Sequence, residues 1–223
     1  MSFPASRFPE RDEDGFGPDD LLRLTGVSRE TLSKIHSYLA VLDDWRERIN
    51  LIGPGEGRHV WRRHVLDSLQ LMKKISADDL RVADLGSGAG FPGLVLACAL
   101  AERPGASVTL VEKSVRKCQF LEAAMKTVGL PGRVLNQRLE DPAPEERFDV
   151  VTARALAPLP KLMGYAYVWL KPSGKALLMK GRDAVTELTL ARESWTFEVS
   201  IGTSLSSPEG QILTVSALGP RRA

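Results

Sequence analysis

The sequence has few cysteines and no long apolar segment. Its two cysteines, Cys98 and Cys118, form no Cys-x-x-Cys pair and fall among apolar residues in predicted helices. This pattern indicates reduced, packed thiols and excludes a disulfide framework. No apolar run approaches the ~20 residues of a membrane span, and residues 2–20 lack the apolar core of a secretory leader. We therefore expect a cytoplasmic protein that does not associate with membranes.

A strong excess of one charge is also missing. The chain has 30 Lys and Arg against 28 Asp and Glu, a formal net charge of +2. Any surface that binds nucleic acid must therefore come from local clusters of cations. With 223 residues, of which 43% are hydrophobic and 26% charged, the chain has an ordinary globular composition and is long enough to bury a large core.

The predicted elements fall into three parts along the chain. Residues 1–17 are rich in Pro, Gly and charge, which predicts a flexible tail. Apolar residues at helical spacing predict two amphipathic helices, over residues 28–49 and 61–75. We expect these helices to lie in a helical extension, residues 18–78. Residues 79–223 are expected to form the main domain, in one structural unit with the extension.

Strands and helices are predicted to alternate in the main domain. This order requires right-handed crossovers and a parallel sheet with helices on both faces. Two β-rich segments, 195–204 and 211–218, flank the turn-forming residues 206–210 and predict an antiparallel hairpin. The fold class is therefore α/β, a Rossmann-like and mostly parallel sheet with a C-terminal hairpin. Strands are expected near 81–85, 107–112, 132–138, 147–153 and 174–180, and helices near 91–102, 114–128, 158–170 and 183–193.

The segment from Val82 to Gly93 carries the clearest functional signal. It predicts a buried strand, a turn through three glycines at alternate positions, and a helix with Pro92 at its first position. Glycine permits a positive φ and close approach of a ligand. A nicotinamide-type fingerprint would need glycine where Phe91 stands. The order of an acidic residue and then G-x-G-x-G is typical of class I methyltransferases that use S-adenosylmethionine, and a purely structural loop is the alternative. The predicted cofactor residues of this turn are Asp84, Gly86, Gly88 and Gly90.

Polar residues also follow the next three predicted strands, at the edge where ligands of such sheets bind. Glu112 ends the second strand, where a carboxylate can accept both hydroxyls of a ribose, and a solvated carboxylate at a helix start is the alternative. Glu140 follows the third strand at the level expected for an adenine, although Glu140 and Asp141 also resemble an ordinary acidic turn. Arg154 ends the fourth strand. Because an unpaired buried arginine would be costly, we predict that it binds an anion.

These segments resemble the bacterial 16S rRNA guanine-N7 methyltransferases, the family also called glucose-inhibited division protein B. The resemblance extends from about residue 45 to about residue 180. It implies that Glu112 binds the ribose of the cofactor. Ile52 stands where the family often has Thr, which removes that hydroxyl. The matching segments are W-x-x-x-x-N-L from Trp45, R-H-x-x-D-S from Arg63, D-x-G-x-G-x-G-x-P-G from Asp84, A-R-A from Ala153 and K-G at Lys180. The other implied cofactor contacts are Gly86, Phe91, Leu139, Glu140 and Arg154.

The chemistry missing from the sequence agrees with this resemblance. Methylation of pyrimidine carbon 5 needs a cysteine nucleophile, but both cysteines lie inside predicted helices. Residues 152–155 stand where methyltransferases of exocyclic amines usually have a D/N-P-P-Y type segment, and no carboxylate follows that strand to activate a ribose hydroxyl. Guanine N7 has a free lone pair at neutral pH and needs no base. Alignment of the reacting atoms, worth on the order of 7–11 kcal/mol, can then carry the reaction.

Two segments rich in cations and free of acids, residues 57–64 and 171–182, predict a rim that binds RNA phosphates. A solvated charged face is the alternative for each. His64, Asp67 and Ser68 share a helix face by their spacing. We expect a hydrogen-bonded cluster or a pocket wall there and no metal, since neither cysteine lies near the histidines. The predicted RNA-binding residues are Arg58, Arg62, Arg63, His64, Lys180 and Arg182.

The sequence therefore predicts an S-adenosylmethionine-dependent enzyme that methylates N7 of one guanine in 16S ribosomal RNA. Arg154 is the predicted catalytic residue. The expected partner is the RNA itself or the small ribosomal subunit particle, and the sequence does not indicate an oligomeric state. Two other functions stay open: a methyltransferase for a small molecule or a protein, and an RNA-binding module without catalysis.

Overall fold

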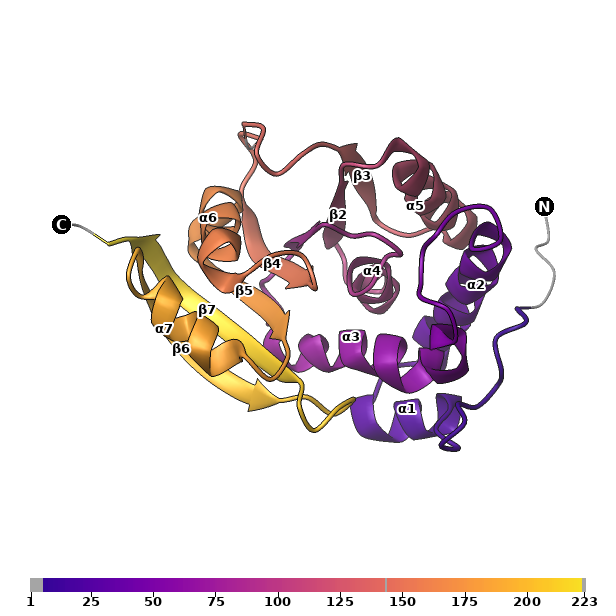
Figure 1. Cartoon of the computed structure of the whole chain (residues 1–223). Coiled ribbons are helices and arrows are strands. Elements are labelled where there is room, and N and C mark those ends of the chain that lie inside the picture. Colours follow the sequence, from indigo (N-terminus) through magenta and orange to yellow (C-terminus); the bar gives the residue numbers. More distant parts are fainter. Residues whose placement is uncertain (1–5, 143, 222–223) are drawn as a thin grey trace.

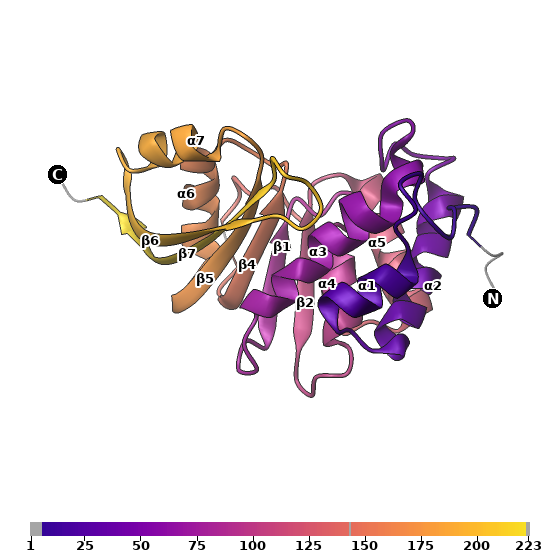
Figure 2. The ribbon, with the colours of Figure 1, turned by 90° about the horizontal axis from the view of Figure 1, so that it is seen from below.

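The computed structural model describes residues 6–142 and 144–221, which build a seven-stranded sheet with helices on both faces (Figures 1 and 2). The strands are β1 (Arg81–Leu85), β2 (Ser107–Glu112), β3 (Gly132–Asn136), β4 (Phe148–Arg154), β5 (Leu170–Lys180), β6 (Trp195–Thr203) and β7 (Gln211–Pro220). Their order in the sheet is β3-β2-β1-β4-β5-β7-β6. Strands β1 to β5 pair in parallel, and β7 is antiparallel to both β5 and β6. This arrangement confirms the predicted parallel sheet and C-terminal hairpin.

The central strands are apolar on both faces because helices cover both. Strand side chains point alternately to the two faces, so Val82 packs in one apolar cluster and its neighbour Ala83 in the other. The first cluster includes α4 (Gly93–Leu100) and α5 (Val115–Val128), and the second includes α6 (Leu159–Trp169) and α7 (Ala184–Ala191). α4 begins directly after Pro92, which is its N-cap residue, whereas the sequence predicted Pro92 at the first helical position.

The helical extension consists of α1 (Pro18–Thr25), α2 (Arg29–Trp45) and a helical stretch from Glu56 to Lys74 that includes α3 (Asp67–Leu69). Figure 2 shows α1, α2, α3 and α4 together on one side of the sheet. Ser28 begins α2, and its hydroxyl accepts a hydrogen bond from the Thr31 amide (2.9 Å). The buried Tyr38 hydroxyl of α2 donates to the carbonyl of Ala89 (2.6 Å), so the extension holds the glycine turn directly.

Residues 6–17 pack against the extension, which differs from the flexible tail predicted from their composition; residues 1–5 of that tail lie outside the described residues. Phe8 and Phe16 are buried in the core. The buried Asp12 carboxylate accepts hydrogen bonds from the amides of Trp61 (3.1 Å) and Arg62 (2.7 Å). Two aromatic anchors and one buried acid therefore order a segment whose composition is otherwise polar.

No helix in the described part of the chain has the length and apolar character of a membrane span. Residues 6–142 and 144–221 also contain no group of three or more His, Cys, Asp or Glu side chains arranged to hold a metal ion. Cys98 and Cys118 are both buried and free, in α4 and α5 as predicted.

Candidate functional site

The turn after β1 depends on glycine at three positions. Gly86, Gly88 and Gly90 have φ values of 71°, 55° and 94°, a region that side chains disfavour. The Gly86 amide donates to the carbonyl of Val111 (2.8 Å), which joins the turn to the end of β2. A Cβ at Gly86 would lie 2.6 Å from Cδ1 of Leu156. Because these three residues have no side chains, their backbone atoms directly border the space next to the turn.

Asp84 lies behind this turn, with only 1% of its surface exposed. Its Oδ1 accepts from the Thr152 hydroxyl (2.8 Å) and its Oδ2 from the Gly93 amide (3.2 Å). Burial raises the pKa of the carboxyl group to about 6, although these hydrogen bonds oppose the shift. Asp84 thus connects β1, β4 and the start of α4. Asp84 does not line the pocket that Gly86 and Gly88 border.

A pocket of about 320 Å³, the glycine-turn pocket, opens beyond the carboxyl ends of β1 to β4. It brings together Gly86, Gly88, Glu112, Leu139 and Glu140, five of the residues predicted to bind the cofactor. Gly90, Phe91 and Arg154 lie outside its lining. The pocket is also lined by residues that were not predicted to bind the cofactor, among them Lys113, Lys117, Leu156, Lys161 and Tyr165. Lys113 directly follows Glu112 at the end of a predicted strand, so the rule that ligands bind beyond strand ends could have indicated it. Lys161 and Tyr165 lie in α6, and no local sequence pattern indicates that they line the pocket.

Glu112 presents a fixed carboxylate to the glycine-turn pocket, with 7% of its surface exposed. Its Oε2 accepts from the Gly88 amide (3.0 Å) and its Oε1 from the Ser114 amide (2.8 Å). A carboxylate oxygen has two lone pairs, so each oxygen can accept one further hydrogen bond. This geometry favours the ribose-binding role over a solvated carboxylate at a helix start.

The segment after β3 forms a side wall of the glycine-turn pocket. The Oε1 atom of Glu140 accepts from the Tyr165 hydroxyl (2.6 Å) and from Lys161 Nζ (3.2 Å), which ties the segment to α6. These two hydrogen bonds, with Tyr165 the larger cause, hold the pKa of the Glu140 carboxyl at about 2. Leu139 packs against the core beside it. Glu140 therefore has a structural partner as well as a place in the pocket.

A second pocket of about 520 Å³, the arginine pocket, adjoins the first, and Ala155 lines both. Arg154 lines only the arginine pocket. Its Nη1 donates to the carbonyl of Arg63 (3.1 Å) and lies 3.5 Å from Oδ2 of Asp67. Its guanidinium carbon lies 5.3 Å from the centre of the Phe91 ring. Arg154 is thus held by partners from the helical extension, and Asp67 supplies an anion.

His64 is a neutral side chain in the wall of the arginine pocket. Its ring stacks on that of Phe91 with centroids 4.8 Å apart. Arg154 Nη2 lies 3.0 Å from His64 Nδ1, and since arginine can only donate, the imidazole proton is on Nε2. Burial first, and then the charges of Arg154 and Arg63, lower the pKa of His64 to about 3. Nε2 is 3.2 Å from Oε2 of Glu56 but is not aligned for a hydrogen bond.

Asp67 joins the extension to the C-terminal hairpin, a role that the sequence analysis missed. Its Oδ1 accepts from Ser204 Oγ (3.1 Å) and Ser206 Oγ (2.5 Å), which are 137 and 139 residues away, and from Gln70 Nε2 (2.9 Å). Of the three residues predicted to share a helix face, His64 and Asp67 line the arginine pocket, and the Ser68 hydroxyl donates to the backbone carbonyl of His64 (2.6 Å). No local pattern indicates the serine partners of Asp67.

Carboxylates reach the arginine pocket although none follows β4 in sequence. Four carboxylates line it, namely Glu56 and Asp67 of the helical extension, Asp183 just before α7, and Glu187 of α7. The Oε2 atom of Glu187 accepts from the Leu159 amide (2.5 Å) and pairs with Lys180 Nζ (2.7 Å). No carboxylate follows β4 in the sequence, but the folded chain brings these four to the pocket of Arg154. Glu56 pairs with Arg63 (3.0 Å), Asp183 is exposed at the start of α7, and the contacts of Asp67 and Glu187 favour a positioning role for these two.

The cations predicted to bind RNA separate into two groups. Arg63, His64, Lys180 and Arg182 line the arginine pocket, whereas Arg58 and Arg62 do not. The ion pairs of the arginines are Arg58 with Glu13 (3.3 Å), Arg62 with Asp14 (2.6 Å), Arg63 with Glu56 (3.0 Å) and Arg182 with Glu209 (2.6 Å). Every predicted arginine of the rim is therefore neutralised locally.

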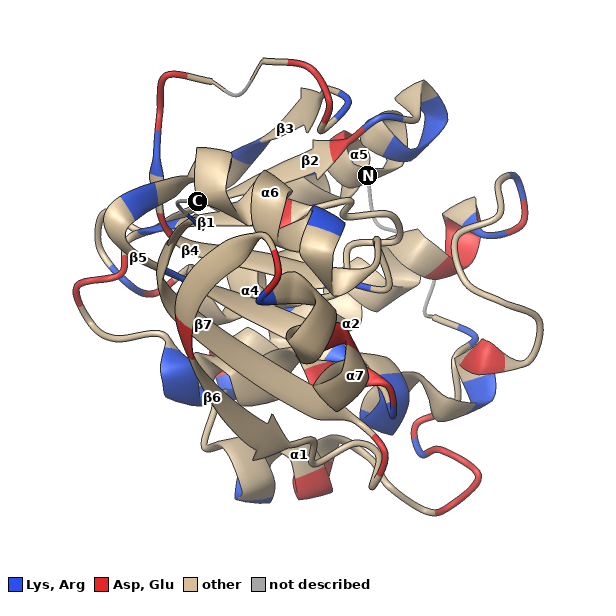
Figure 3. Ribbon diagram, turned by 60° about the vertical axis from the view of Figure 1, so that its left-hand side comes forward, with Lys and Arg blue, Asp and Glu red and all other residues tan. Residues whose placement is uncertain are grey.

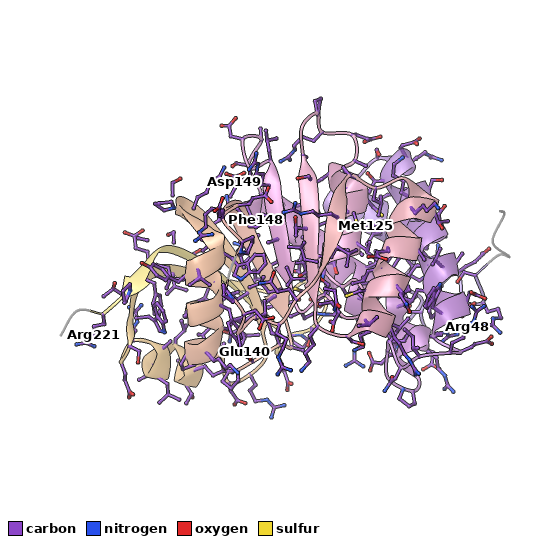
Figure 4. The ribbon with its side chains drawn as sticks, turned by 90° about the horizontal axis from the view of Figure 1, so that it is seen from above. Arg48, Met125, Glu140, Phe148, Asp149 and Arg221 are labelled. Carbon is purple, nitrogen blue, oxygen red and sulfur yellow. The ribbon has the colours of Figure 1, made fainter. Side chains whose placement is uncertain are left out.

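The expectation that all of residues 171–182 border the same edge is wrong. These residues form most of β5, which runs from the end of the sheet where its parallel strands begin to the end where they finish. Lys171 pairs with Asp149 (2.5 Å) and Lys175 with Asp79 (2.7 Å) at the amino-terminal edge. In Figure 4, Asp149 lies at the opposite end of the sheet from Glu140. Only the end of the segment reaches the arginine pocket.

Comparisons with known proteins agree with this geometry. The sequence profile of the family described as rRNA small subunit methyltransferase G matches residues 31–213. A protein of Parvibaculum lavamentivorans named ribosomal RNA small subunit methyltransferase G is 48% identical over 199 residues, covering 88% of each chain. A protein of the same name from Paramagnetospirillum magneticum is 45% identical over 207 residues, covering 93% of this chain and 98% of its own.

Solved structures resemble the chain in fold. An O-methyltransferase from Bacillus cereus in complex with SAH has a TM-score of 0.56 at 14% identity, covering 82% of this chain and 90% of its own. The S-adenosylmethionine-dependent methyltransferase SibL has a TM-score of 0.57 at 13% identity, covering 84% and 76%. The sheet and its helices thus have the fold of these methyltransferases.

Proposed function

Because the chain belongs to the rRNA small subunit methyltransferase G family, we propose that it methylates N7 of one guanine in 16S ribosomal RNA. The methyl donor is S-adenosylmethionine, and the substrate is the RNA or the small-subunit particle. The enzyme works in the cytoplasm, where that RNA is assembled. Arg154 is its principal active-site residue, on the side of the RNA.

The glycine-turn pocket has the groups that S-adenosylmethionine requires. When bound, this cofactor supplies an activated methyl group on its sulfonium sulfur. Gly86 and Gly88 allow close approach of the ligand, and a Cβ at Gly86 would already crowd Leu156. The free lone pairs of Glu112 suit the two ribose hydroxyls. Leu139 and Gln137 provide an apolar and an amide surface for the adenine.

The observation that carries the proposal is that Ala155 lines both pockets. A ligand in the glycine-turn pocket and a base in the arginine pocket would meet at this residue. Ala155 has a φ of 50°, which is uncommon for a residue other than glycine. Its backbone is therefore held in a specific conformation at the boundary where reacting groups must approach.

The arginine pocket suits an acceptor that needs no deprotonation. His64, with its pKa of about 3, is a poor proton acceptor, and Arg154 already occupies its Nδ1 lone pair. Of the four carboxylates in its wall, Asp67 and Glu187 accept hydrogen bonds from fixed neighbours, Glu56 pairs with Arg63, and Asp183 is exposed to solvent at the rim. These residues can hold a base in place, and guanine N7 requires only positioning because its lone pair is free.

The decisive test replaces the acceptor atom and leaves the rest of the RNA intact. Labelled S-adenosylmethionine is incubated with two 16S rRNA transcripts, one normal and one with 7-deazaguanosine in place of guanosine. We expect incorporation into the normal transcript only, and strand cleavage at one guanine after reduction and aniline treatment. Equal incorporation into both transcripts would exclude N7 as the acceptor while leaving methyl transfer to RNA intact. Incorporation into neither would contradict activity on free 16S rRNA, and the small-subunit particle would then be assayed in the same way.

A further inference from the structure

The start of α5 carries cations that have no carboxylate partner. Lys113 follows β2, Arg116 and Lys117 lie in the first turn of α5, and Arg138 follows β3. In the part of the chain that the structure describes, none of these four side chains forms an ion pair with Asp or Glu. Figure 3 shows Lys and Arg in blue along this part of α5. We name these four residues the α5 cation surface.

Lys113, Arg116 and Lys117 follow β2 and Arg138 follows β3, and the two chain segments leave the sheet side by side. Glu112 of β2 is in register with Asn136 of β3. The Asn136 side-chain amide donates to the carbonyls of Glu112 and Lys113, both at 3.0 Å, and joins the two loops. Both loops lie at the carboxyl-terminal edge of the sheet, the edge of the two pockets. The α5 cation surface therefore flanks the candidate site.

The charges on α5 oppose its helix dipole. The amino-terminal end of a helix favours anions, and the first turn of α1 follows that rule with Asp19 and Asp20. The first turn of the 14-residue α5 contains no acid, and Ser114 makes no side-chain cap. The Glu112 carboxylate already accepts from the Ser114 amide (2.8 Å) at this helix start, but within the described residues it forms no ion pair with the four cations, so their charge stays available to a bound anion.

This surface contrasts with the cations predicted from sequence, whose arginines are all ion-paired. An unpaired cation can bind a phosphate without first breaking an ion pair. We infer that the RNA backbone crosses the α5 cation surface, next to the cofactor, instead of binding mainly at the paired arginines. This inference rests on the proposed function, because the partner is the RNA substrate.

A second consequence concerns the cofactor. Lys113 and Lys117 line the glycine-turn pocket as well as belonging to the α5 cation surface. A strand that lies across them covers one side of that pocket. Bound RNA therefore slows exchange of the cofactor, so that the cofactor enters before the RNA and leaves after it.

The test uses the double variant Arg116→Ala/Arg138→Ala, which removes two cations that do not line either pocket. Lys126→Ala is the matched control, since Lys126 is exposed, makes no ion pair among the described residues and lies at the other end of α5. Affinity for a 16S rRNA transcript is measured between about 50 and 200 mM KCl. The slope of log affinity against log salt should become shallower by about 0.7–0.9 for each lost contact.

We expect the double variant to show this shallower slope, with the cofactor dissociation constant equal to that of the parent and the melting temperature no lower than that of the parent. The Lys126→Ala slope should match the parent. With bound cofactor, RNA should slow release of labelled cofactor from the parent more than from the double variant.

Three outcomes overturn the inference. If the parent methylates the transcript but the double variant keeps the parental slope, RNA does not use this surface and the proposed function stands. A change in Lys126→Ala half as large as that in the double variant would mean that only net charge matters, because the control loses one positive charge and the double variant loses two. A parent that methylates neither 16S rRNA nor the particle would refute the proposed function, and the inference falls with it.

Discussion

Replacement of Asp84 by Asn should make the protein more stable relative to the parent as the pH rises. The Asp84 carboxyl group is buried, and its pKa of about 6 lies above the ordinary value of 3.8. Between these two values the folded state binds a proton that the unfolded state has lost, so stability falls with rising pH. About two pKa units correspond to about 3 kcal/mol, fully expressed above pH 6. Asn cannot ionise and escapes this penalty, while its carbonyl can still accept from the Gly93 amide.

The comparison of parent and variant isolates this group, because all other titrating residues cancel. The free energy of unfolding is measured by urea denaturation of both proteins at several pH values. About half of the effect, roughly 1.4 kcal/mol, falls between pH 5 and pH 8. Across this range, we expect the free energy of unfolding of the variant to rise by that amount relative to that of the parent. Parallel curves would show that Asp84 titrates normally and that the buried carboxylate carries no such penalty.

Three further substitutions test the geometry of the two pockets. Glu112→Gln should raise the cofactor dissociation constant in calorimetry, since hydrogen bonds to a charged group contribute about 1.5–3 kcal/mol; an unchanged constant would remove the ribose assignment. Gly93→Ala places a Cβ 2.6 Å from Oδ2 of Asp84 and should destabilise the fold by about 1–3 kcal/mol, while Gly202→Ala, with no atom nearer than 3.8 Å, should melt with the parent. Arg154→Lys should lower kcat for RNA with little change in cofactor affinity, because an ammonium cannot reach both the Arg63 carbonyl and His64; unimpaired turnover would count against the role of the guanidinium.

The parts of the site that follow from backbone pattern could be predicted from the sequence. Glu112 and Arg154 are the last residues of parallel strands and Asp84 is the last but one of β1, and such strands bring their carboxyl ends to one edge. The three alternating glycines fix the turn above them. Topology alone therefore places these residues together, even though it does not say whether each side chain faces a ligand or, like Asp84, supports the turn from behind.

Contacts between distant segments could not be predicted in this way. Asp67 meets Ser204 across 137 residues, and no periodicity links them. Residues 57–64 and 171–182 contain no acids, which indicated cations free to bind phosphate. In the folded chain Arg62 pairs with Asp14 and Arg182 with Glu209, and only the fold brings these acids close. A count of charges along the sequence does not show which charges are neutralised in space.

The position of Asp67 also bears on how the protein is made. Chain synthesis runs from the amino terminus, and the walls of the glycine-turn pocket are complete once Tyr165 has emerged. The arginine pocket needs Ser204 to Ile212 as well, because β7 inserts between β5 and β6 and its loop binds Asp67. All residues that line the glycine-turn pocket are therefore synthesised before the arginine pocket is complete. Termination before residue 204 would leave a chain that contains every lining residue of the first pocket and lacks one wall of the second.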